Sequence, residues 1–147
     1  MQLSPFVEGE APVATAGTLQ QLADTLLVEL MLSGYSLTPD DVIGGMVHGA
    51  ECYAPWAVFE AQRNAVASLV IDGAFPLSAD EWIIIQPLVR AYLDKIQAKR
   101  MESARSSGAE AFGLSVSEAE QAYEVQHELL PKAAFIEEVF SFEPLES

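Results

Sequence analysis

The sequence predicts a mainly α-helical domain of four or five helices, one of them long and kinked, and three observations carry this prediction. Apolar residues recur at spacings of three and four over long stretches, as on one face of a helix. Capping signals precede these stretches, and glycine or proline follows most of them. The 147 residues, half of them hydrophobic, suffice for one hydrophobic core. We therefore expect one domain.

The two ends of the chain lack the helical pattern. Residues 1–17 carry two prolines and several small residues without a sustained period, which predicts an extended N-terminal arm. Residues 132–147 include a run of alternating positions, which predicts a strand or an extended C-terminal tail. The helical domain is thus expected over residues 18–131, with room for a short strand pair.

Two helices are expected in the first third of the chain. Thr18 and Gln21 have the spacing of a capping box, and leucines follow at helical spacing until Gly34 provides a stop. Thr38 caps a second helix, and Pro39 suits its first turn because the nitrogen there needs no helical partner.

The second helix, which should run to about Tyr53, has unusual features at both ends. Asp40 and Asp41 could share a metal or a proton, but their place in the first turn favours helix-end acids. A face of small residues follows, consisting of Gly44, Gly45, Gly49 and Ala50. Because glycine costs about 1 kcal/mol per helical site, this face predicts close approach by another backbone.

The segment 55–72 is ambiguous. The spacing of Phe59, Val66 and Leu69 permits a helix, whereas the branched residues of 66–71 permit a strand. We expect a helix that gives way to a short extended piece ending at Asp72.

The long helix is expected over about Ala79–Ser106. Ser78 and Glu81 form a second capping box at its start, and apolar residues then repeat at helical spacing. Pro87 removes one backbone hydrogen bond inside the helix and predicts the kink.

A short acidic helix is expected in the last third of the chain. Ser115 and Glu118 form its capping box, and the apolar period ends at Leu130, just before Pro131.

The charge of the chain excludes some classes of partner. With 22 acidic and 7 basic residues the formal charge is −15, which argues against binding to nucleic-acid phosphates or anionic lipid. Five bases fall on the predicted long helix: Arg90, Lys95, Lys99, Arg100 and Arg105. Either these bases lie toward the C-terminal end of the helix because the helix dipole favours cations there, or they form a basic ridge that docks on the acidic surface of an identical neighbour.

The sequence predicts no enzyme, no cofactor and no metal site. His48 and Cys52 stand four apart on the second helix, as a base and a thiol would. No third group that would orient them can be inferred, so a packed thiol is the better interpretation. A zinc site would need more ligands than one cysteine and a distant His127 supply.

The terminal segments contain large apolar residues that must be buried against another part of a structure. They are Phe6 and Val7 near the start, and Phe135, Ile136, Val139, Phe140 and Phe142 near the end. Either both ends wrap the helices of their own domain, or they add to a neighbouring subunit as an arm or strand.

Four stretches resemble structural proteins of tailed bacteriophages. They are Thr38–Ile43, Asp72–Ser78, Asp80–Trp82 with Pro87 and Leu88, and Gly113–Glu118. The resemblance spans most of residues 38–135 and rests on motifs of fold, not of chemistry.

This resemblance implies a virion component, namely a head-to-tail connector (a neck or adaptor protein) assembled in the host cytoplasm. Such proteins are helical, lack catalysis and form rings that link the portal to tail or neck components, and DNA passes through them without specific binding. The resemblance transfers no catalytic residue. A strongly acidic ring would repel DNA and so guide its passage.

Other classes stay open. The very acidic C-terminal third departs from the pattern of connector proteins, and it would fit a tail or decoration protein. An acidic regulatory or inhibitory binding protein made during infection is the main competitor, and a thiol enzyme is a third. No stretch of 18 uninterrupted apolar residues occurs, so no membrane association is expected.

Overall fold

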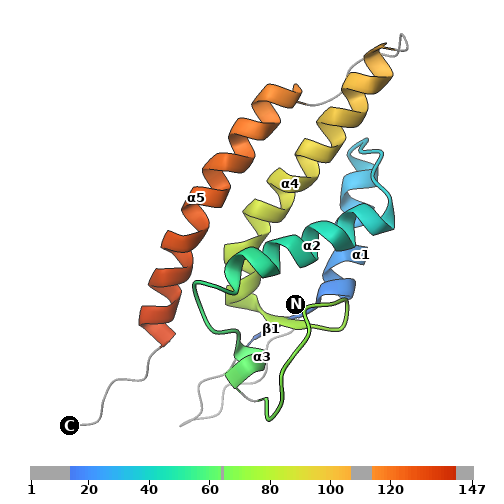
Figure 1. Ribbon diagram of the computed structural model, residues 1–147. Helices are drawn as coiled ribbons and strands as arrows, with labels where there is room; N and C mark the ends of the chain where they lie inside the picture. Colours follow the sequence, from blue (N-terminus) through green and yellow to red (C-terminus); the bar gives the residue numbers. More distant parts are fainter. Residues whose placement is uncertain (1–13, 64, 107–113, 142–147) are drawn as a thin grey trace, which may run out of the picture.

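The computed structural model describes residues 14–63, 65–106 and 114–141, and it confirms the mainly helical fold. Five helices and a two-stranded sheet make up these residues. Helix α4 runs through the middle, α5 lies along one side of it, and α1 and α2 lie on the other (Figure 1). The core forms where α1, α2 and α4 meet.

Helices α1 (Leu19–Leu32) and α2 (Pro39–Tyr53) have the predicted bounds and caps. The Thr18 hydroxyl accepts the Gln21 N–H, and the Gln21 side chain accepts the Thr18 N–H. A turn at Ser33 and Gly34 follows α1, and Gly34 has a φ of 94°. Such a backbone angle favours glycine, which explains the stop.

The small-residue face of α2 packs on α4, although not in the way predicted. Gly45, Gly49 and Ala50 are buried, and a Cβ atom at Gly49 would lie 2.6 Å from Val89 Cγ2. Gly44 does not belong to this contact, because a Cβ there would meet nothing within 4 Å. Side chains of α4, rather than its backbone, fill the space that the glycines leave.

Helix α4 (Ala79–Ser106) also has its predicted bounds and continues past Pro87 on both sides; the bend itself stays a prediction. Its start is fixed by a small antiparallel sheet of β1 (Thr15–Thr18) and β2 (Pro76–Ser78). The last residues of the predicted arm are therefore extended, but they form a strand within the domain.

The expectation for residues 55–72 is met only in part, because the helix is much shorter than expected. Only one helical turn forms there, α3 (Glu60–Arg63), and residues 65–75 form neither helix nor strand. The physical reason is that these residues offer no continuous face to the core. Phe59 and Phe75 anchor the two ends, with ring centroids 4.9 Å apart, and Ile71 packs beside them.

The extended tail predicted over 132–147 is wrong for residues 132–141. Helix α5 (Val116–Ser141) opens at the Ser115 capping box as expected but continues through Pro131. Leu130 and Ala134 are buried on either side of that proline. Their packing offsets the lost backbone bond, which costs about 3 kcal/mol. Residues 142–147 lie outside the described residues.

Candidate functional site

Titratable and aromatic side chains from three helices meet at the junction of α2, α4 and α5. His48 Nε2 on α2 lies 2.6 Å from the Tyr123 hydroxyl on α5 and 3.6 Å from Cys52 Sγ. The His48 ring stacks on Tyr92 of α4, with centroids 4.5 Å apart. His48 therefore joins all three helices.

The electrostatics of this junction favour uncharged side chains. Burial, with the nearby His127, lowers the pKa of His48. Burial, with the negative charge of Glu51, raises the pKa of Cys52. A nucleophilic thiol needs the opposite shift. Cys52 is half-buried against the core, which confirms the prediction of a packed thiol.

A shallow depression lies on the α5 side of the junction. Its volume is about 180 Å³, and its lining consists of Tyr123, Glu124, His127 and Glu128. Lys95 Nζ lies 4.1 Å from the centroid of the Tyr123 ring, a cation–π arrangement. Within residues 14–63, 65–106 and 114–141, no three His, Cys, Asp or Glu side chains are placed to hold a metal ion.

The five bases of α4 do not form one ridge. Arg90 donates to both carboxylate oxygens of Glu29 on α1, at 2.9 and 3.1 Å. Lys95 lies over Tyr123, and Arg100 contacts Asp41 on α2. Three of the five thus have partners within the monomer. Lys99 and Arg105 are exposed.

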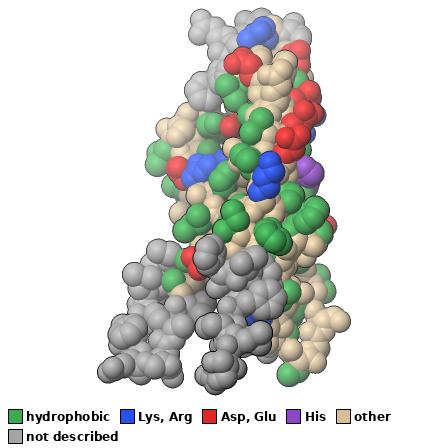
Figure 2. Space-filling view, turned by 90° about the vertical axis from the view of Figure 1, so that its left-hand side faces the viewer, with side chains coloured by type: hydrophobic (Ala, Val, Ile, Leu, Met, Phe, Trp, Pro, Cys, Tyr) green, Lys and Arg blue, Asp and Glu red, His purple; other side chains and the backbone are tan. Residues whose placement is uncertain are grey.

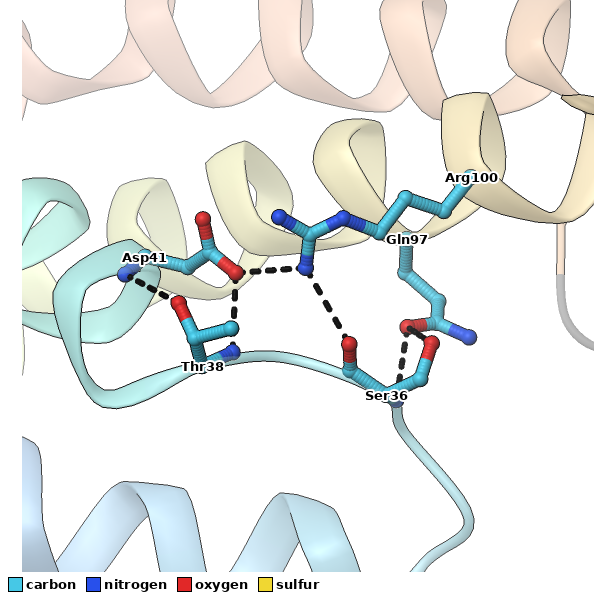
Figure 3. A network of polar contacts seen from close by, with 5 residues as sticks. All are labelled: Ser36, Thr38, Asp41, Gln97 and Arg100. Carbon is cyan, nitrogen blue, oxygen red and sulfur yellow. Dashed lines mark hydrogen bonds and ion pairs between the residues drawn. The ribbon is translucent and has the colours of Figure 1, made fainter.

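Arg100 belongs to a polar network that fixes the loop between α1 and α2 (Figure 3). Arg100 donates hydrogen bonds to the Ser36 carbonyl and to the Asp41 carboxylate. The hydrogen bond from Arg100 to Asp41 is the main reason that the pKa of Asp41 falls to about 2. Buried Gln97 accepts the Ser36 N–H at 2.9 Å. Asp41 also accepts the Thr38 N–H, so the acid predicted as a helix cap holds α4 as well.

Two apolar surfaces are exposed, one near the end of α1 and the other in the loop after α3, and Figure 1 shows these two segments apart from each other. The first, here called the α1 surface, lies near the end of α1 and consists of Val28, Met31 and Leu32. The second, the loop surface, lies after α3 and consists of Val66, Leu69 and Val70. Leu32 is 85% exposed and Val66 is fully exposed. Neither surface was predicted from the sequence.

A third exposed set lies on α5. Phe135 and Ile136, both predicted as interface residues, are 67% and 56% exposed there. Val139 and Phe140 are in α5, but their side chains lie outside the described part. The predicted residues Phe6, Val7 and Phe142 also lie outside it.

One signal could have located the α1 surface. Eight of the fourteen residues of α1 are Leu, Val or Met, more than one buried face of a helix needs. Only Leu19, Leu26 and Leu30 among them are fully buried. The loop surface gave no such signal, because its apolar run fits a buried strand equally well.

Comparison of the chain with protein-family models, curated proteins and solved structures gave no match. Among the helices that the structure describes, none has the length and apolar character needed to cross a membrane.

Proposed function

We propose that this protein is a structural subunit that assembles with copies of itself into a ring. In this proposal the α1 surface of one copy packs on the loop surface of the next. The single observation that carries it is the presence of two different exposed apolar surfaces on one monomer. Two different surfaces give a head-to-tail contact, which closes into a ring when the rotation between copies permits.

The local charge at these surfaces supports such a contact. Glu29 beside the α1 surface is neutralised by Arg90. Residues 64–71, which contain the loop surface, hold no charged side chain. Two copies of a chain with formal charge −15 can therefore approach here through largely uncharged surfaces, with the exposed Asp24, one turn before Val28 on α1, at the edge of the contact.

We further propose that the ring is a head-to-tail connector of a tailed-phage virion, linking the portal to tail or neck components. Support for this narrower proposal comes from the resemblance of four sequence stretches. Three of them include the starts of α2, β2 and α5, where capping residues fix the ends of elements. The stretches thus concern the framework of the domain, as expected for a protein without catalysis.

Mass spectrometry of purified virions tests the connector proposal. The expected result is the protein in particles at a fixed number of copies, comparable to that of the portal protein. Its absence from particles but presence in infected cells would contradict the proposal and favour an acidic regulatory protein.

The thiol-enzyme alternative has a separate test. Cys52 should react slowly with iodoacetamide at neutral pH in the folded protein, because burial raises the pKa of its thiol. Alkylation much faster than that of a free cysteine peptide would revive the enzyme hypothesis.

A further inference from the structure

Helix α5 presents two parallel rows of side chains away from the core. Its inner face is buried and includes Ala119, Leu130 and Ala134. An outer row consists of Glu120, Glu124 and Glu128, one residue per turn, all exposed. A second outer row consists of Val125, Leu129 and Ile136, which lie within a sector of about 40° at 3.6 residues per turn, about 120° around the helix from the glutamates.

Figure 2 views the molecule from the α5 side. Acidic side chains gather along one edge of its upper half, and hydrophobic side chains lie across the middle of the same face. Phe135, two turns after Glu128, extends the acidic row with an exposed aromatic ring. The face is thus apolar along one line and anionic along another, and the exposed Lys132 lies between them, one turn after Glu128 and one turn before Ile136.

We infer that this outer face of α5 binds a basic amphipathic helix from a different protein. Leucine-like side chains of such a helix would cover Val125 and Leu129, and its lysines or arginines would pair with the glutamate row. The choice of partner rests on charge complementarity. An apolar contact alone would accept many partners, whereas three carboxylates in a row favour a cationic one.

A second copy of this chain fits the face poorly. Placing α5 against α5 would oppose two acidic rows. Of the five bases on α4, Arg90, Lys95 and Arg100 are engaged inside the monomer. Nucleic acid and anionic lipid are repelled by the same carboxylates. The inference goes beyond self-assembly and would stand even if the chain proved monomeric.

A peptide titration tests the inference on the full-length protein. The probe is a fluorescent helical peptide of leucine and lysine, with leucine on one face, followed by anisotropy. It should bind, and binding should weaken at least about tenfold when salt rises from 0.05 to 0.5 M, because exposed ion pairs are screened. A matched peptide with glutamine for lysine should bind at least about tenfold more weakly.

Two variants and one control locate the contact. The triple variant Glu120→Gln, Glu124→Gln, Glu128→Gln and the double variant Leu129→Ser, Ile136→Ser should each weaken binding at least about tenfold. A control triple variant replaces exposed acids elsewhere: Asp24→Asn, Asp40→Asn and Asp80→Asn. It should change affinity less than about twofold, since it leaves α5 intact.

Three results would overturn the inference. One is a loss of peptide affinity in the control variant equal to that in the glutamate variant, which would mean that the peptide is attracted by the net charge of the protein alone. Another is unchanged affinity in both α5 variants. The third is that the double variant Leu129→Ser, Ile136→Ser loses self-association but still binds the peptide. That result would mean that the outer face of α5 binds a second copy of this chain. Leu32→Asp, which breaks the proposed ring contact, should leave peptide affinity unchanged, so the two proposals fail separately.

Discussion

Gly49 shows at the scale of one residue why α2 carries glycines despite their helical cost. A Cβ atom there would lie 2.6 Å from Val89 Cγ2 and 2.9 Å from Ile85 Cγ2. These distances are too short for a real side chain, so α4 can pack at its present distance only against a glycine. Neither neighbour is the end of a long side chain that could move aside cheaply.

Gly49→Ala should therefore lower the free energy of unfolding by about 1 to 3 kcal/mol, although alanine is the better helix former. Gly44→Ala is the matched control on the same helix, where a Cβ atom meets nothing. It should raise stability by about 0.5 to 1 kcal/mol. Urea denaturation of both variants measures these changes, and equal effects at the two sites would contradict the packing described.

His48 sets a pH dependence at the same scale. Its pKa is lowered in the folded chain, so folding favours the neutral ring. The contribution to stability is present above the ordinary histidine pKa of about 6.5 and falls as pH drops through that value. It levels off once the folded His48 is protonated too.

Urea denaturation between pH 5 and 8 checks this dependence by the difference between the wild type and His48→Gln. That difference should shrink as pH falls, because the histidine of the wild type binds a proton more readily in the unfolded chain than in the folded one, and glutamine binds none. His127→Gln should reduce the dependence without abolishing it, because the nearby His127 helps to lower the pKa of His48 while burial, the larger cause, remains. A difference that grows toward pH 5 would contradict the assigned sign.

At the scale of elements, the limits of local sequence signals are visible. The capping boxes at Thr18, Ser78 and Ser115 located three helix starts, because such caps depend on residues three apart in the chain. The end of α5 depends instead on packing against α4, which no local pattern reveals. Pro131 suggested a stop, but buried Ala134 continues the helical period beyond it.

Pro131→Ala tests whether α5 truly continues. If it does, alanine restores a backbone bond to the His127 carbonyl and should raise stability by about 1 kcal/mol or more. Helical circular dichroism should not fall. Any Pro→Ala change makes the unfolded chain more flexible, and Pro55→Ala, at a position outside any helix, is the control for this effect. Pro55→Ala should not raise the stability of the protein. Destabilisation by Pro131→Ala would mean that the helix stops at Leu130.

At the scale of the whole molecule, the acidic charge lies largely apart from the two surfaces of the proposed ring contact. The sequence alone revealed the acidity of both ends but not how the bases are used. Arg90 and Arg100 lie 61 and 59 positions from their acidic partners, so only the fold could pair them. The apolar interface residues predicted from the sequence were terminal, whereas the α1 surface comes from residues 28–32 and the loop surface from residues 66–70.

The balance between these two features sets the conditions for assembly. Copies with a formal charge of −15 repel one another at long range, while the proposed contact itself is largely uncharged. Added salt screens the repulsion over a Debye length of about 10 Å at 0.1 M. Self-association should therefore strengthen with ionic strength, the reverse of the salt response expected for the peptide on α5.

A mixing experiment by sedimentation velocity tests the central claim most directly. Leu32→Asp disables the α1 surface, and Val70→Asp disables the loop surface, so each variant alone should be monomeric at high salt. Mixed in equal amounts, they should form a dimer and nothing larger, because each retains one complementary surface. A mixture that stays monomeric, or a single variant that assembles like the wild type, would contradict the head-to-tail contact.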